Sequence, residues 1–344
     1  MILLTGANGH LGANLLRRLL QDGEQVRVLL RPHSDNSTVD GLPVERVYGD
    51  LRDAPAVAAA AQGCSHVYHT AAKVSTLGRE HREIYECNVI GARNLLRAAA
   101  AAGVTKVVVS GSLSAVGHDP LQPCDESVPF DPFQKHLPYS ISKSFVEHEC
   151  LKAAVDGLNV VVAVSCAIVG PWDFKPSRMG RVLVDFSNRR MKAYVPGGFE
   201  FVSTYDIVEG HVLAMRKGRS GQKYIFTTQF LTVDQLMDIY GQVTGQPRPP
   251  LRIPPAVMAG IAEVSSVVMT NLFPAVPQRF TPAAVRFLRM QRRASCDKAR
   301  RELGYQPTSI VDAIQQAYNW FVERGAVRRP SAAQRAEQVK VAGL

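Results

Sequence analysis

The amino-acid sequence predicts an α/β fold with a doubly wound parallel sheet and a smaller, interleaved C-terminal substrate lobe. Three observations support this prediction. Short apolar runs of strand length alternate with stretches of helical periodicity up to about residue 170. A glycine-rich turn joins the first run to a helix. The arginine-rich stretch 174–196 then departs from this alternation. A chain of 344 residues suits one large or two interleaved domains.

The first apolar run, residues 2–5, enters a turn with glycine at every third position and then an amphipathic helix. Gly6 permits the tight turn, Gly9 lets the backbone approach a pyrophosphate, and Gly12 lets the helix pack close to the strand. The N–H groups of the first helical turn then face the phosphates. The predicted phosphate-binding residues are Gly6, Asn8, Gly9, His10, Leu11 and Gly12.

The second strand, residues 25–30, ends at the position that selects the cofactor. An acidic side chain there binds the ribose hydroxyls of NAD, whereas a basic one accommodates the extra phosphate of NADP. Arg31 occupies this position, and no acid follows before Asp35. We therefore favour NADP(H) over NAD(H). The alternative interpretation is that Arg31 is a solvent-facing loop charge.

The third strand, residues 44–53, ends in an acidic cap, and the fourth, residues 67–72, finishes on small residues. Ala71 and Ala72 are small enough for the backbone to lie against a cofactor. Lys73 either points toward the substrate or is a solvated loop residue. Within the acidic cap, Asp50 or Asp53 is a candidate to cap the following helix.

A Tyr-x-x-x-Lys motif, Tyr139 and Lys143, follows a fifth strand at 106–112 that ends on Ser112. Residues four apart share one face of a helix, so the phenol and the ammonium point the same way. Tyrosine ordinarily titrates near about 10. A neighbouring lysine lowers that pKa, and Tyr139 can then exchange a proton with a carbonyl or an alcohol.

Taken together, the glycine spacing, the serine-ended strand and the Tyr-x-x-x-Lys motif resemble the extended short-chain dehydrogenase/reductase superfamily, the NAD-dependent epimerase/dehydratase group. The resemblance covers nearly the whole chain. Within it, dihydroflavonol-reductase-like, 3β-hydroxysteroid-dehydrogenase-like and hopanoid-associated epimerase-like reductases look nearest. It implies a Rossmann-type domain in which Ser112 binds the substrate carbonyl, with Ser110 and Ser114 as competing candidates. Lys143 then also binds the nicotinamide ribose. The cofactor contacts it implies include Asp50, Leu51, Asn88, Tyr139, Lys143, Cys166, Ile168 and Val169.

One departure from the family bears on the substrate. Ser165-Cys166 follows the sixth strand, where the family usually has Arg-Pro or Asn-Pro. Because that arginine is common among sugar-nucleotide enzymes, its absence favours a different substrate. We expect residues 1–170, with 201–227 returning, to form the dinucleotide-binding domain. The substrate lobe then comprises 171–200 and 228–325, and 326–344 form a flexible tail.

The proline-bounded stretch 247–277 has an apolar centre. It is either an amphipathic core helix or a lid that admits an apolar substrate, with peripheral membrane contact as a further option. A net charge of +10 comes largely from late arginines, and no nucleic-acid-binding motif accompanies them. We therefore expect a solvated basic face and no nucleic-acid partner.

Six cysteines are scattered without the spacing of a metal site. We expect buried thiols, no bound metal, no signal peptide, no membrane span and a cytoplasmic location.

The leading functional hypothesis is reduction of a ketone in a mid-sized, largely apolar metabolite of isoprenoid, steroid or other secondary-metabolite type. Hydride transfer then uses Ser112, Tyr139 and Lys143. A nucleotide-sugar 4-epimerase with tightly held NAD is the alternative, and a cofactor-sensing binder without chemistry is a second one. By analogy with the family, the chain is also a candidate homodimer.

Overall fold

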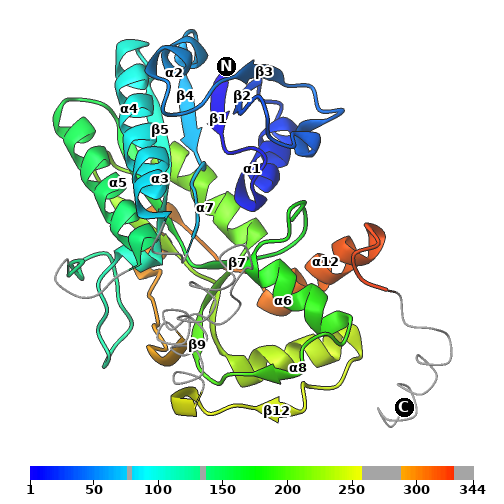
Figure 1. The fold of residues 1–344 in the computed structure, drawn as a ribbon. Helices are drawn as coiled ribbons and strands as arrows, with labels where there is room; N and C mark the ends of the chain where they lie inside the picture. Colours follow the sequence, from blue (N-terminus) through cyan, green and yellow to red (C-terminus); the bar gives the residue numbers. More distant parts are fainter. Residues whose placement is uncertain (76–79, 132–136, 258–287, 329–344) are drawn as a thin grey trace.

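A seven-stranded parallel sheet forms the centre of the protein, which we describe as a computed structural model (Figure 1). The structure describes residues 1–75, 80–131, 137–257 and 288–328. The strand order is β10-β6-β5-β4-β1-β2-β3. The chain winds outward from β1 in both directions, so the predicted doubly wound sheet is confirmed. Its strands are β1 (Ile2–Thr5), β2 (Val26–Leu30), β3 (Glu45–Tyr48), β4 (His66–His69), β5 (Lys106–Ser112), β6 (Val160–Ser165) and β10 (Lys223–Phe226).

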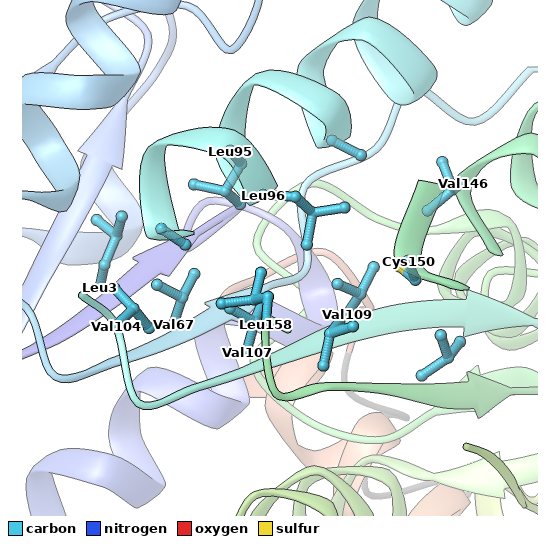
Figure 2. Packing of buried hydrophobic residues seen from close by; sticks show 14 of the residues in the cluster. Leu3, Val67, Leu95, Leu96, Val104, Val107, Val109, Val146, Cys150 and Leu158 are labelled. Atoms are coloured by element: carbon cyan, nitrogen blue, oxygen red, sulfur yellow. The ribbon is translucent and has the colours of Figure 1, made fainter. Parts of the chain in front are cut away.

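Helices cover both faces of this sheet because successive strand residues point to opposite sides. Val107 and Val109 of β5 pack with Leu95 and Leu96 on one face, as Figure 2 shows, whereas Val108 belongs to the core on the other. The first face is covered by α2 (Ala54–Ala61), α4 (Gly91–Ala101) and α5 (Pro138–Val155). The second is covered by α1 (His10–Gln21), α7 (Thr204–Lys217) and α11 (Asp297–Leu303).

A second lobe has its own core. β6 and β7 (Ala167–Val169) are consecutive in sequence but lie in different sheets, so the chain passes from one sheet to the other at Cys166. β7 joins a small sheet of order β11-β9-β7, with β9 (Gly198–Ser203) and β11 (Gln229–Thr232). The helices α6 (Arg178–Ser187), α8 (Val233–Thr244) and α12 (Ile310–Glu323) pack against it. A two-stranded sheet pairs β8 (Ala193–Tyr194) with β12 (Leu251–Arg252).

The return to the large sheet begins later than residue 201, because β9 still belongs to the small sheet up to Ser203. Ser203 caps α7, since its hydroxyl accepts a hydrogen bond from the Asp206 N–H at 2.9 Å. Asp206 itself is buried and accepts hydrogen bonds from Thr228 and Thr308. Its carboxylate therefore joins three distant segments.

A cluster of arginine and aromatic side chains joins α1 to the second lobe; we call it the tryptophan cluster. The rings of Trp172 and Trp320 lie 4.5 Å apart, and Phe174 lies 5.1 Å from Trp320. The Arg17 guanidinium of α1 lies 4.1 Å from the Trp172 ring, and Arg324 lies 5.2 Å from Trp320. These cation–π contacts tie the end of α12 to the dinucleotide-binding half.

Residues 258–287 and 329–344 lie outside the described residues, and with them most of the predicted lid and tail. Among the described helices, none has the length and apolarity needed to cross a membrane. All six cysteines are free thiols. Within the described ranges no group of His, Cys, Asp and Glu side chains is arranged to hold a metal ion.

Candidate active site

The glycine turn between β1 and α1 forms an open cradle. Gly6 has a φ of +83°, and a side chain there would meet the backbone N of Ala71 at 2.5 Å. A side chain at Gly12 would collide with the Gly6 carbonyl. A side chain at Gly9 would meet only the Gly6 oxygen, at 3.3 Å, so this face of the turn is not covered by protein. Gly9 provides no side-chain cap for α1, and no acid stands in its first turn. The turn therefore fits a phosphate.

The side chains around this cradle brace it. The Asn8 amide donates to the Asn36 side-chain oxygen at 2.5 Å, which ties the turn to the loop after β2. His10 Nε2 lies 3.2 Å from the Gly170 carbonyl and 3.1 Å from that of Pro171. Leu11 is buried in the core. Three of the predicted phosphate-binding residues, Asn8, His10 and Leu11, therefore use their side chains to stabilise the turn and the core.

Arg31 and Asp50 stand near each other where β2 and β3 end. Arg31 is exposed. Two hydrogen bonds of 2.8 Å from Arg52 lower the pKa of Asp50, and the charge of Arg31 lowers it further. Asp53, in contrast, caps α2 by accepting from the Ala56 N–H at 3.2 Å. The cap predicted after β3 is therefore Asp53, and the Asp50 carboxylate pairs with Arg52.

Asn88 links the end of β4 to the helix that carries Tyr139. It lies in a single π-helical turn, Glu86–Ile90, a feature often found at functional sites. Its side chain accepts from the Lys73 N–H at 2.7 Å and donates to the Lys73 carbonyl at 3.0 Å and to Ser142 Oγ at 3.0 Å. The backbone that follows Ala71 and Ala72 is fixed in this way. The Lys73 ammonium pairs with Glu83 at 2.5 Å.

Leu51 packs against the start of α4, because a side chain added at Gly91 would meet the Leu51 Cβ at 2.9 Å. At the other end of the site, Cys166 and Ile168 are half-buried at the crossing between the sheets. The Val169 side chain is buried in the core of the second lobe. Of these last three residues, Val169 therefore leaves only its backbone for a ligand.

Ser112 and Tyr139 are in contact at the carboxyl end of β5. The Ser112 hydroxyl acts on the Tyr139 phenol and favours a lower pKa of that group. Ser114, in the 3₁₀ turn Leu113–Ala115, places its hydroxyl 2.9 Å from that of Ser112. Both Ser112 and Tyr139 are half-buried, so each combines contact with protein and access from solvent. The structure thus brings together two of the three residues predicted to be catalytic.

Lys143 is buried one turn further along α5. Its ammonium donates to the Ser110 carbonyl at 2.7 Å, and burial lowers its pKa to about 8. The Ser110 hydroxyl lies 2.7 Å from His211 Nε2, and His211 Nδ1 lies 2.7 Å from the Ile207 carbonyl. Burial lowers the pKa of His211 to about 4, so the ring is neutral at pH 7. Since a carbonyl only accepts, Nδ1 carries the proton and Ser110 donates to Nε2. The proton of the Ser110 hydroxyl is therefore already donated to His211.

The pKa of Tyr139 departs from the sequence prediction. We expected Lys143 to lower it, yet burial raises the pKa of the phenol. The hydrogen bond with Ser112 and the positive charge of Arg178 partly oppose that rise. The physical reason is desolvation of the phenolate. Tyr139 therefore keeps its proton at neutral pH and is ready to donate it.

Arg178 is a residue of the site that sequence reasoning did not single out. It opens α6, directly after the cap residue Ser177, and its charge interacts with the Tyr139 phenol. The sequence feature that could have drawn attention to Arg178 is its pairing with Arg181, one helical turn away, behind a serine cap. That pattern predicts two charges at one helix end, although it does not identify Tyr139 as their neighbour.

Comparisons with known proteins show the family to which the chain belongs. Residues 2–226 match the model of the NAD dependent epimerase/dehydratase family. The chain is 43% identical to "Sterol demethylase protein B" of Methylococcus capsulatus, over 94% of this chain and 99% of that protein. It is 33% identical to a "Putative dihydroflavonol 4-reductase" of Synechocystis, over 94% and 95% of the two chains. The crystal structure of gox2253 superposes with a TM-score of 0.84 at 32% identity, covering 95% of this chain and 99% of that one.

Proposed function

The chain belongs to the NAD dependent epimerase/dehydratase family of short-chain dehydrogenases/reductases, and on that premise we propose that it interconverts a ketone and a secondary alcohol in a lipophilic substrate. It is thus an NAD(P)-dependent oxidoreductase. The observation that carries the proposal is the interaction between Ser112 and Tyr139 at the carboxyl end of β5, with Lys143 buried one turn further along α5. This arrangement combines a hydrogen-bond donor and a proton donor at one point.

Each side chain has a definite task in the proposed reaction. When bound, the nicotinamide cofactor supplies or accepts the hydride. Ser112 donates a hydrogen bond to the substrate oxygen, and Tyr139 gives that oxygen its proton in the reductive direction. Lys143 is anchored on the Ser110 carbonyl at 2.7 Å, and from there its ammonium would bind the nicotinamide ribose. Because burial keeps Tyr139 protonated, the site is prepared for reduction.

Arg31 supports a preference for NADP(H). It follows β2, and an acid that would bind free ribose hydroxyls is lacking at this position. The glycine turn and the first turn of α1 would hold the pyrophosphate. Replacing Arg31 by Asp should raise the Kd for NADPH about tenfold and leave that for NADH unchanged or improved. Fluorescence titration of both cofactors measures this, and equal losses for both would contradict the preference.

The substrate class is argued from two features. Ser165-Cys166 departs from the arginine found in sugar-nucleotide enzymes, and the relative from Methylococcus is named for a sterol. We therefore infer an isoprenoid- or steroid-like substrate. A nucleotide-sugar 4-epimerase, by contrast, would retain NAD through purification and consume no NADPH.

Turnover of a panel of lipophilic ketones with NADPH tests the proposal directly. The Tyr139→Phe variant should lose about 10²- to 10⁴-fold in kcat and keep its affinity for NADPH, because only the proton donor is removed. Tyr205→Phe is the matched control, since Tyr205 is an exposed tyrosine of α7. A Tyr139→Phe enzyme with full activity would overturn the assignment.

We also propose that two copies of the chain pair through α5. Its solvent side carries four exposed apolar residues that lie on one face of the helix. They are Ile141, Phe145, Leu151 and Val155. Tyr85 of α3 (His81–Tyr85) extends this face, because its ring lies edge-on to that of Phe145 with the ring centroids 6.1 Å apart. Such a face suits a self-complementary twofold interface.

A further inference from the structure

The segment 292–296 is tied to both lobes through its backbone. Cys124 packs in the core beneath the large sheet, and its N–H donates to the Arg293 carbonyl at 3.0 Å. From the second lobe, the buried carboxylate of Glu200 on β9 accepts a hydrogen bond from the Ala294 N–H at 2.9 Å. These contacts fix the backbone directly after residue 292.

Arg292, the first residue of this segment, reaches the turn that follows the proposed catalytic hydroxyl. Its side chain is buried, with the residue only 6% exposed, and its Nη1 donates to the Leu113 carbonyl at 2.6 Å. Leu113 comes directly after Ser112, and its carbonyl also accepts from the Val116 N–H at 3.1 Å. The guanidinium thus holds the same carbonyl that closes the 3₁₀ turn.

The turn Leu113–Ala115 decides which protons surround Ser112. Ser112 has one hydroxyl proton, and the proposed mechanism places that proton on a hydrogen bond to the substrate oxygen. Ser112 Oγ accepts from the Ser114 N–H at 3.3 Å, and the Ser114 hydroxyl lies 2.9 Å from it. With the turn in this shape, Ser114 can donate to Ser112 from both its backbone and its side chain. The Ser112 proton then stays available to the substrate.

Arg292 costs the fold stability, because burial removes its guanidinium from water and so lowers its pKa. The groups that oppose this shift are the thiols of Cys124 and Cys166, whose own pKa values are raised by burial. Among the described residues none offers Arg292 a carboxylate, and its Nε is buried without an acceptor. An uncharged side chain of similar length would suit this interior better, so packing alone does not account for the arginine.

We propose that Arg292 is a positioning residue, which holds the turn Leu113–Ala115 so that the Ser112 hydroxyl can donate to the substrate oxygen. This inference rests on the proposed function, in which Ser112 binds that oxygen. Lys143 donates to the Ser110 carbonyl at 2.7 Å on the other side. Two buried cations therefore anchor the backbone before and after Ser112.

Steady-state reduction of 5α-androstan-3-one with NADPH tests the role of Arg292. Arg292→Met should lower kcat about tenfold to a hundredfold, the cost of a misplaced catalytic group, and change KM and the Kd for NADPH little. Arg292→Lys should recover part of this loss, because its ammonium can donate to the same carbonyl. Arg293→Met is the matched control, since Arg293 is exposed and lies over the Phe230 ring. It should keep the wild-type kcat.

A double-mutant cycle shows whether Arg292 acts through Ser112. In the Ser112→Ala background, Arg292→Met should lower kcat no further, because the hydroxyl that it positions is gone. Its melting temperature should equal or exceed that of the wild type, since a buried charge is removed. Losses of kcat that add in the double variant would overturn the inference. A fall in kcat that parallels a fall in melting temperature would also overturn it.

Amide hydrogen exchange of the enzyme without substrate separates this inference from the proposed function. In Arg292→Met the amides of residues 113–117 should exchange about tenfold faster, while the rest of β5 and the Arg293→Met control stay as in the wild type. Unchanged exchange in this turn would refute the positioning role, even if activity fell. If the turn loses protection but the wild type reduces no ketone, the positioning role of Arg292 stands and the proposed function fails.

Discussion

At the scale of single residues, the hydroxyl groups at the end of β5 are distinguished by their partners. Ser110 donates to His211, whereas Ser112 contacts Tyr139. Replacing Ser112 by Ala should therefore lower kcat about 10²- to 10³-fold, as loss of one transition-state hydrogen bond does. Ser110→Ala should cost less than tenfold. Steady-state kinetics of the two variants decide this, and the reverse order would assign the catalytic hydroxyl to Ser110.

Lys143 gives the site a pH dependence whose sign can be worked out. Burial lowers its pKa from 10.5 to about 8. Because the folded value is the lower one, the native state gives up its proton first as the pH rises. Below pH 8 the buried charge of Lys143 therefore lowers the free energy of unfolding by its full amount. This loss of stability disappears as the pH rises from 8 to 10.5. Its charge, which the proposed mechanism needs, is lost over the same range.

We thus expect kcat/KM to fall above about pH 8 while the contribution of Lys143 to stability rises. The readouts are a pH–rate profile and thermal unfolding at each pH for the wild type and Lys143→Met. The difference in stability between the two proteins should shift in favour of the wild type above pH 8. A constant difference from pH 7 to pH 10.5 would mean that Lys143 titrates normally.

At the scale of elements, the outer face of α5 is the feature with a solution-state consequence. Phe145 is 46% exposed there and in edge contact with Tyr85. Replacing Phe145 by Glu puts a charge at the centre of the proposed twofold interface and should convert a dimer into a monomer. Light scattering measures the mass, with Val311→Glu on α12 as an exposed apolar control. A wild-type protein that is already monomeric would refute the pairing.

At the scale of the whole molecule, the sequence predicted what local periodicity encodes. The glycine turn, the parallel strands and the four-residue spacing of Tyr139 and Lys143 each depend on neighbours along the chain. Contacts between distant segments determine the roles of Arg178, His211 and Asp206, and no local sequence pattern predicts such a contact. The sign of the Tyr139 pKa shift was wrong for a related reason, since it depends on burial by the complete fold.

The tryptophan cluster has an optical consequence. The chain contains two tryptophans, and both lie in this one cluster, with their rings 4.5 Å apart. All indole emission of the protein therefore originates where α1 of the dinucleotide-binding half meets α12. A reduced nicotinamide absorbs at wavelengths where indole emits, so binding of NADPH should quench the tryptophan fluorescence. A rearrangement of the two halves should shift the wavelength of maximum emission. The molecule thus carries a built-in probe of its own ligand occupancy, with no label attached.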